Sequence, residues 1–145
     1  MYYHIYCNPT QFGVNYHDAV NEFKKRLSAY CTTTLYLDRH LSFSGNISSG
    51  NHCFLQICSG PSSYSSEEFA KVIDSFQHSG RSNVHILIGY SEAECMSALS
   101  GLCENEMLSK CSLSACSLPA DTLTLLFYEQ LYRSYTILQG KTYHK

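Results

Sequence analysis

The stretch from Cys53 to Tyr90, CFLQICSGPSSYSSEEFAKVIDSFQHSGRSNVHILIGY, decides the fold of this chain. It begins with a short apolar run, CFLQIC at 53–58, which ends at the turn-forming residues SGPSS. A run of this length, apolar on both alternating faces, is typical of a strand buried in a parallel sheet. A second such run, NVHILIGY, occupies residues 83–90 and predicts another buried strand.

The segment between these two strands predicts an amphipathic helix. Ser65 and Glu68 have the spacing of a capping box, in which each side chain bonds the backbone N–H of the other residue. Gly80 stands where a helix C-terminal cap is expected. The apolar residues that share one face of this helix are Phe69, Val72, Ile73 and Phe76. The whole stretch is therefore a strand–helix–strand unit.

The same alternation continues on both sides of this unit. Further strands are predicted at 2–7 and 32–37, helices at 15–30, 92–102 and 121–138, a strand or extended segment at 110–118, and a mobile loop at 42–52. Apolar strands that alternate with helices indicate an α/β fold with a mostly parallel sheet and helices on both faces. Without a linker or repeat, residues 1–145 are expected to form a single domain.

In such sheets, ligands bind where strand ends open into loops. The three candidate loops are CSGPSS at 58–63, IGYSEA at 88–93 and SLSACSLP at 112–119. Neither GxGxxG nor GxxxxGK[ST] occurs, which argues against a Rossmann NAD site and a nucleoside triphosphate loop.

The formal net charge of −2 excludes a protein that holds nucleic acid by its overall charge alone. The N-terminal MYYHIYCNPT lacks the charged and apolar regions of a signal peptide, and the apolar runs are too short to span a membrane. We therefore expect a soluble, intracellular, cytoplasmic protein without membrane contact.

Eight cysteines could form disulfides, bind a metal or lie buried as small apolar side chains. No two of them have the C-x₂-C spacing of a zinc site, and the histidines fit no metal-ligand spacing. Several cysteines fall inside apolar runs, which favours buried, reduced thiols and no bound metal. A zinc-binding module remains an alternative that metal analysis would test.

Five segments in order, LSAYC, ICSGPSSYSSEEFA, VHILIGYSEAE, KCSLSACSLP and YEQLYRSYTILQGKTYHK, resemble the large-subunit rRNA pseudouridine N3-methyltransferase family. This family belongs to the knotted SPOUT class of enzymes that use S-adenosylmethionine (SAM). The most specific part is EQLYRSYTILQGKTYHK, in which a Glu-x-Leu-Tyr-Arg helix is followed by a terminal Tyr-His. The likeness extends from about residue 15 to the end, and is weaker over the first strand and residues 35–52.

The resemblance implies a homodimer with a deep C-terminal trefoil knot that methylates N3 of a pseudouridine in large-subunit (23S) rRNA of the ribosome. The three loops would line the SAM pocket and bind the cofactor mainly through backbone groups. The cofactor-binding positions carried over are Ile57, Gly60, Gly89, Leu113, Ser114, Ala115, Cys116, Ser117 and Leu118. The RNA-facing and catalytic positions are Arg133, Tyr143 and His144, with Lys145 beside them.

Roles for the catalytic residues follow from their chemistry. His144 is the candidate acceptor of the N3 proton, because an imidazole titrates near neutrality. Arg133 offsets charge on the base or holds a phosphate, or else forms an ion pair with Glu129 one turn away. We expect Tyr132 and Tyr135 to be core or dimer-interface aromatics. A dimer would gather the basic residues Lys24, Lys25, Arg26, Arg133 and Lys145 toward one cleft for the rRNA.

The chain departs from the family pattern at several positions. Tyr90 replaces an expected glycine and would crowd the methionine arm of SAM, while Ala120 and Thr124 replace an expected histidine and arginine. Ala93 falls in the same altered second loop. The alternative function is therefore a SPOUT-fold protein that binds RNA or SAM without turnover.

Overall fold

The structure is a computed structural model that describes residues 1–43, 47, 50–102 and 108–143. The elements in chain order are β1 (Tyr2–Cys7), α1 (Val14–Leu27), β2 (Thr32–Leu37), β3 (His52–Ser59), α2 (Ser66–His78), β4 (Asn83–Ile88), α3 (Glu92–Leu99), β5 (Leu108–Ser114) and α4 (Ala120–Leu138). Every predicted strand and helix is present, although the predicted helix 15–30 ends at Leu27. Part of the loop predicted as mobile at 42–52 lies outside the described residues.

The five strands form one sheet in the order β2-β1-β4-β3-β5, and every pair of neighbours is parallel. This confirms the α/β fold with a parallel sheet. The capping box predicted at the start of α2 is also formed, because Ser65 and Glu68 each bond the backbone N–H of the other. The deep trefoil knot stays a prediction.

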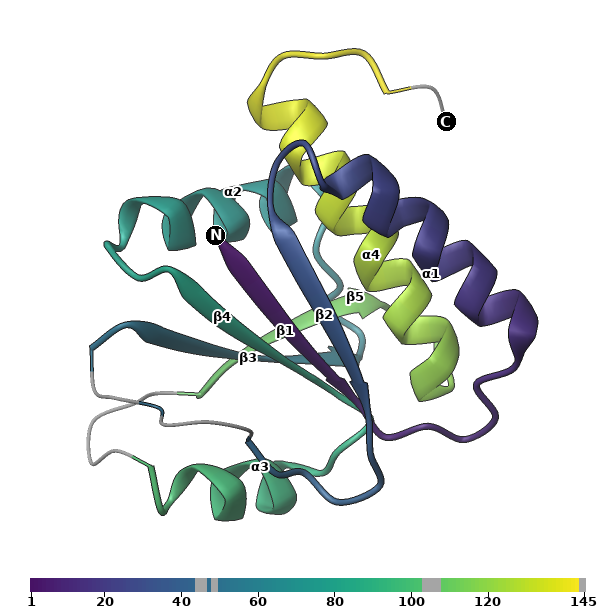
Figure 1. The fold of residues 1–145 in the computed structure, drawn as a ribbon, viewed down its shortest axis with the longest axis vertical. Helices are drawn as coiled ribbons and strands as arrows, with labels where there is room; N and C mark the ends of the chain where they lie inside the picture. Colours follow the sequence, from purple (N-terminus) through teal and green to yellow (C-terminus); the bar gives the residue numbers. More distant parts are fainter. Residues whose placement is uncertain (44–46, 48–49, 103–107, 144–145) are drawn as a thin grey trace.

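Helices α1, α2 and α4 cover one face of the sheet, and α3 lies on the other (Figure 1). The main core fills the space under the three helices. In β4, Val84, Ile86 and Ile88 belong to this core, whereas Leu87 belongs to a second cluster on the α3 side. Because both faces of β4 are buried, its sequence is a continuous apolar run rather than an alternating one.

Helix α4 lies between α1 and α2 and packs against both of them, as well as against the sheet (Figure 1). This position explains why α4 has more apolar residues than a helix with a single packed face. The surplus is largely buried within one chain, and only Ile137 and Leu138 are exposed large apolar residues of α4. A homodimer stays a prediction, and the apolar residues of α4 are accounted for within one chain.

The second cluster, on the α3 side, contains Tyr6, Leu87, Tyr90 and Cys95. Beside it, the ring of His85 is 2% exposed and stacks on His4 with 4.8 Å between ring centroids. Nε2 of His85 lies 2.9 Å from Nδ1 of His52, while its buried Nδ1 has no hydrogen-bond partner among the described residues. Burial, followed by the neighbouring His4 and His52, lowers the pKa of His85 to about 3.

We expect acid to destabilise the protein through His85. In the unfolded chain this imidazole takes up a proton near its ordinary pKa of about 6.5, but the folded protein resists protonation until about pH 3. The free energy of unfolding should therefore fall as the pH drops through this window, by about 2 kcal/mol between pH 6.5 and pH 5. Urea unfolding at a series of pH values measures this slope.

Two variants isolate the contribution of His85. His85→Phe should flatten the pH dependence in this window, because the ring stack is kept and the titrating group is lost. His78→Gln removes an exposed histidine of α2 and should leave the slope unchanged. If the His85→Phe protein shows the same pH slope as the wild type, His85 is not the group responsible.

Seven cysteines lie within the described residues, and all seven are free thiols. Five of them are buried, Cys58 is half-buried and Cys116 is exposed. Burial raises the pKa of the Cys111 thiol to about 12, so this group stays protonated near neutral pH. The prediction that most cysteines act as buried apolar side chains is confirmed for five of these seven residues.

In the described part of the chain, no helix combines the length and apolar character needed to cross a membrane. The same residues contain no group of three or more His, Cys, Asp or Glu side chains placed to hold a metal ion.

Candidate cofactor and catalytic site

The three loops singled out in the sequence follow β3, β4 and β5. In the sheet, β3 lies directly between β4 and β5, and all three strands run in the same direction. Their carboxyl ends therefore open at one edge of the sheet, as ligand sites in parallel sheets require. The tertiary structure thus brings the three predicted loops to one place.

The loops after β3 and β5 are joined directly by hydrogen bonds. The N–H of Gly60 donates to the carbonyl of Ser114 at 2.8 Å, and the Ser112 hydroxyl donates to the Gly60 carbonyl at 3.3 Å. On the other side, the N–H of Leu118 donates to the Ser59 hydroxyl at 3.3 Å. These bonds hold the first and third loops in a fixed relation to each other.

Not all of the predicted cofactor-binding residues lie in loops. Ile57 is inside β3, and its side chain is 2% exposed in the main core. Leu113 and Ser114 are the last residues of β5, and the Ser114 carbonyl is already bonded to Gly60. These three residues therefore form walls and supports of the site, because all three lie within strands.

The rest of the third loop is accessible. Ala115, Cys116 and Ser117 are exposed, and the Cys116 N–H donates to the Ser114 hydroxyl at 3.1 Å. Leu118 is half-buried and packs against the main core, which anchors the loop before α4 begins. Backbone groups at 115–117 are consequently the part of this loop available to a ligand.

The second loop is fixed by different neighbours. Gly89 has φ of +82°, in the left-handed region that favours glycine, and its carbonyl accepts a hydrogen bond from the Asn8 side chain at 3.2 Å. A Cβ atom at Gly89 would lie 2.6 Å from the Cβ of Ala120 and 3.2 Å from the Asn8 carbonyl oxygen. Gly89 is thus wedged between the β1–α1 connection and the start of α4.

The resemblance implied that the Tyr90 side chain projects from the second loop toward SAM. In the structure, Tyr90 is a core residue. Its side chain is 5% exposed in the cluster on the α3 side, and its hydroxyl donates to the carbonyl of Asp38. Its carbonyl accepts a hydrogen bond from the Gln56 side chain at 2.9 Å. Replacement of Tyr90 by glycine would therefore open a cavity in a core rather than clear space for a cofactor.

Asp121 supports the site in a way that the sequence pattern did not reveal. This residue of α4 is 3% exposed, and its two carboxylate oxygens accept the backbone N–H groups of Thr10 and Gln11 at 3.1 and 2.7 Å. These bonds hold the β1–α1 connection, which in turn holds Gly89 through Asn8. An acidic residue in the first turn of a helix is a common pattern, so the sequence alone did not indicate these two long-range bonds.

The two other departures from the family pattern are packed residues in this chain. Ala120 is the first residue of α4 and lies against Gly89. Thr124 is completely buried, and its hydroxyl donates to the Ala120 carbonyl at 2.8 Å. Neither side chain projects a charge toward the loops.

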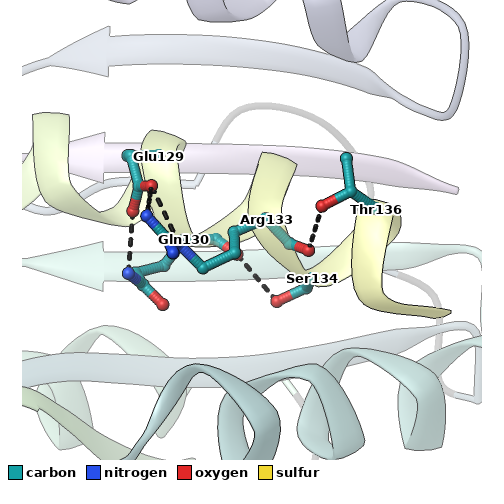
Figure 2. A network of polar contacts seen from close by, with 5 residues as sticks. All are labelled: Glu129, Gln130, Arg133, Ser134 and Thr136. Atoms are coloured by element: carbon teal, nitrogen blue, oxygen red, sulfur yellow. Dashed lines mark hydrogen bonds and ion pairs between the residues drawn. The ribbon is translucent and has the colours of Figure 1, made fainter. Parts of the chain in front are cut away.

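Arg133 is held by its own helix. Its Nε and Nη2 atoms both donate to the Glu129 carboxylate, and the two side chains are only 17% and 20% exposed. Gln130 donates to the other oxygen of Glu129 at 2.7 Å, so that Glu129 fixes both neighbours (Figure 2). Two roles were considered for Arg133, and the structure forms one of them, the ion pair with Glu129.

Tyr143 packs onto this ion pair. Its ring centroid is 4.7 Å from the Arg133 guanidinium carbon and 5.3 Å from the ring centroid of Tyr132. Partial burial raises the pKa of the Tyr143 hydroxyl, and the nearby Glu129 carboxylate raises it further. Arg133 and Tyr143, both predicted to be catalytic, are therefore brought together, whereas His144 and Lys145 lie outside the described residues.

A cavity of about 200 Å³ lies between this group and the start of α2. Ser66 and Glu67, in the first turn of α2, line it together with Arg133 and Tyr143. Helix α2 begins directly after the loop that follows β3. Arg133 and Tyr143 therefore lie beside the start of α2, whereas the end of α4 that contacts Gly89 is its first residue, Ala120.

A parallel α/β sheet whose three neighbouring strands end in exposed loops at one place is the arrangement of a ligand-binding α/β protein. The model of the family described as "Predicted SPOUT methyltransferase" matches residues 38–144. The chain belongs to this family.

Similar proteins carry a more particular name. The chain is 27% identical over 145 residues to "Ribosomal RNA large subunit methyltransferase H 1" of Thermoanaerobacter sp. (strain X514), with both chains covered completely. It is 29% identical over 151 residues to "Ribosomal RNA large subunit methyltransferase H" of Acetivibrio thermocellus, covering 88% of this chain and 89% of the relative. A protein of the same name from Saccharophagus degradans is 41% identical over 83 residues, or 57% of this chain and 50% of that protein.

Proposed function

We propose that this protein methylates large-subunit ribosomal RNA with SAM as the methyl donor, at N3 of a pseudouridine. The observation that carries the proposal is the alignment of the whole chain with a relative named as a large-subunit rRNA methyltransferase. The grouping of Arg133 and Tyr143 beside the start of α2 supports it.

The loop edge suits a cofactor that is held mainly through the main chain. Gly89 and residues 115–117 are exposed there, and the bond between Gly60 and Ser114 keeps the surrounding backbone fixed. When bound, SAM supplies an electrophilic methyl group on a sulfonium. The protein then has to place the N3 nitrogen in line with that methyl group and exclude water from it.

The protein must also handle charge and one proton. Transfer of the methyl group to N3 releases the proton that this nitrogen carried, and His144 accepts it. Arg133 offsets negative charge on the base or holds a phosphate. In the described residues its Nη1 makes no hydrogen bond, because the ion pair with Glu129 uses Nε and Nη2. This nitrogen is the one available to the RNA.

A second candidate function is binding of RNA or SAM without turnover. Ala120 and Thr124 stand where the family pattern has a histidine and an arginine. Neither residue presents a polar group to the loops, which favours this second candidate. Activity would then be lost although the fold and the loop edge are kept.

One experiment decides between the two. The purified protein is incubated with isotope-labelled SAM and bacterial large ribosomal subunits that lack the modification, and the modified nucleotides are mapped by mass spectrometry. Transfer to one pseudouridine at N3 supports the proposed function. Binding of SAM by calorimetry without transfer supports the second candidate, and absence of both binding and transfer contradicts both.

A further inference from the structure

Three cationic side chains lie over tyrosine rings where α1 and α4 end. The distance from the cationic group to the ring centroid is 5.9 Å for Arg26 over Tyr132, and 4.7 Å for Arg133 over Tyr143. Lys141 lies 5.3 Å from the centroid of Tyr30 and contacts its hydroxyl at 3.3 Å. We call this set the cation–ring row, which consists of Arg26, Tyr30, Tyr132, Arg133, Lys141 and Tyr143.

The three pairs form one continuous surface. The ring of Tyr132 contacts that of Tyr143, with centroids 5.3 Å apart, and that of Tyr30, with centroids 6.2 Å apart. Helices α1 and α4 lie side by side, and both end in the upper part of Figure 1. Sequence positions more than one hundred residues apart therefore meet in a single row.

The surface carries local positive charge in a chain whose formal net charge is −2. Lys24 and Lys25 lie next to Arg26 in the last turn of α1. Two carboxylates reduce the charge: Glu22 pairs with Arg26 at 3.2 Å, and Glu129 pairs with Arg133. Lys141 has no carboxylate partner within the described part of the chain. Because both side chains of the Glu22–Arg26 pair are about half exposed, a stronger anion can compete for Arg26.

We propose that the cation–ring row binds the phosphate backbone of the RNA substrate. The inference rests on the proposed function and adds the surface by which the RNA is held. An arginine or lysine already placed over a ring loses less side-chain freedom when it binds a phosphate, which lowers the entropic cost of the contact. Guanidinium groups also match phosphate oxygens in geometry.

RNA fits this surface better than another anionic partner because the row includes two of the candidate catalytic residues. Arg133 and Tyr143 belong both to the row and to the cavity at the start of α2. A strand bound along the row would thus reach the C-terminal segment that is expected to act on the base. Phosphate contacts of this kind fix the position of the RNA on the protein but do not distinguish one base sequence from another.

The first test measures binding of the full-length protein to bacterial large ribosomal subunits over a range of potassium chloride concentrations. Arg26→Gln and Lys141→Gln should each weaken binding about 3- to 10-fold and lower the slope of log Kd against log salt by roughly 0.7–0.9. Arg39→Gln removes an equal charge from the segment after β2, at the opposite end of the molecule, and should leave both quantities unchanged.

A second variant separates ring placement from charge. Tyr30→Leu keeps every charge but removes the ring beneath Lys141, and should weaken binding about 2- to 5-fold with an unchanged salt slope. Melting temperatures and SAM affinity should stay constant in all four variants. An unchanged affinity in Tyr30→Leu would overturn the role assigned to the ring.

The outcomes distinguish this inference from the proposed function. If the wild type methylates the subunits but Arg26→Gln and Lys141→Gln bind them as tightly as the wild type does, the row is not the RNA surface. If Arg39→Gln weakens binding to the subunits as much as the row variants do, binding depends on total charge and not on this surface. That result would also overturn the inference. If the subunits bind through the row but receive no methyl group, only the proposed function fails. Tighter binding to acidic phospholipid vesicles than to subunits would assign the row to a membrane surface.

Discussion

Replacement of His144 by alanine is expected to slow methylation of large ribosomal subunits by roughly 10²–10⁴-fold, the usual range for the loss of a general base. The physical reason is that the proton on N3 must leave as the methyl group arrives, and alanine cannot accept it. Tyr143, the preceding residue, is fixed by Arg133 and Tyr132, so position 144 follows an anchored point of the chain. Single-turnover rates at saturating SAM measure the effect.

The matched control is His78→Gln, which removes an exposed histidine of α2 and should leave the methylation rate unchanged. Melting temperature and SAM affinity should stay constant in His144→Ala, because no core residue is changed. A variant that methylates at close to the wild-type rate would remove His144 from the mechanism. Loss of SAM binding in the same variant would instead give the residue a structural role.

Replacement of Gly89 by alanine is expected to lower the free energy of unfolding by about 2–4 kcal/mol. Two costs combine at this position. The backbone has φ of +82°, which an alanine adopts only with strain, and the added Cβ would lie 2.6 Å from the Cβ of Ala120. Neither neighbour moves easily, because Asp121 and Asn8 tie the β1–α1 connection to α4 and to Gly89. Denaturant unfolding provides the measurement.

Gly80→Ala is the matched control for this prediction. Gly80 has φ of +74°, close to that of Gly89, but a Cβ there would meet no described atom within 4 Å. Its replacement therefore reports backbone strain alone and should cost roughly 1 kcal/mol. If the two variants lose the same stability, the close approach of Gly89 to Ala120 contributes nothing.

Local sequence patterns were sufficient for the secondary structure because the interactions behind them are local. The capping box of α2 joins Ser65 to Glu68, three residues away, so its spacing is visible in the chain itself. The Glu129–Arg133 ion pair, with partners one helical turn apart, could be foreseen in the same way. The apolar runs of β3 and β4 also predicted a sheet that is covered on both faces.

The candidate site was predicted in outline, through the loops after β3, β4 and β5 and the Arg133–Tyr143 segment. Side-chain directions within it were not predictable. Whether Tyr90 faces a loop or a core depends on the Asp38 carbonyl, 52 residues away, which accepts its hydroxyl. Ile57 was carried over as a cofactor-binding position, although β3 continues past it to Ser59 and its side chain is buried in the main core.

The sequence by itself thus determined the elements, their order, the α/β class and the family, since each depends on periodicity, capping and motifs within short segments. The tertiary structure alone decided what α4 packs against, which residues anchor Gly89, and that Arg26 and Lys141 meet Arg133 in one row. These relations join residues as far apart as Thr10 and Asp121. A hydrogen bond or ring contact at that separation leaves no spacing pattern along the chain, because folding rather than local geometry brings its partners together.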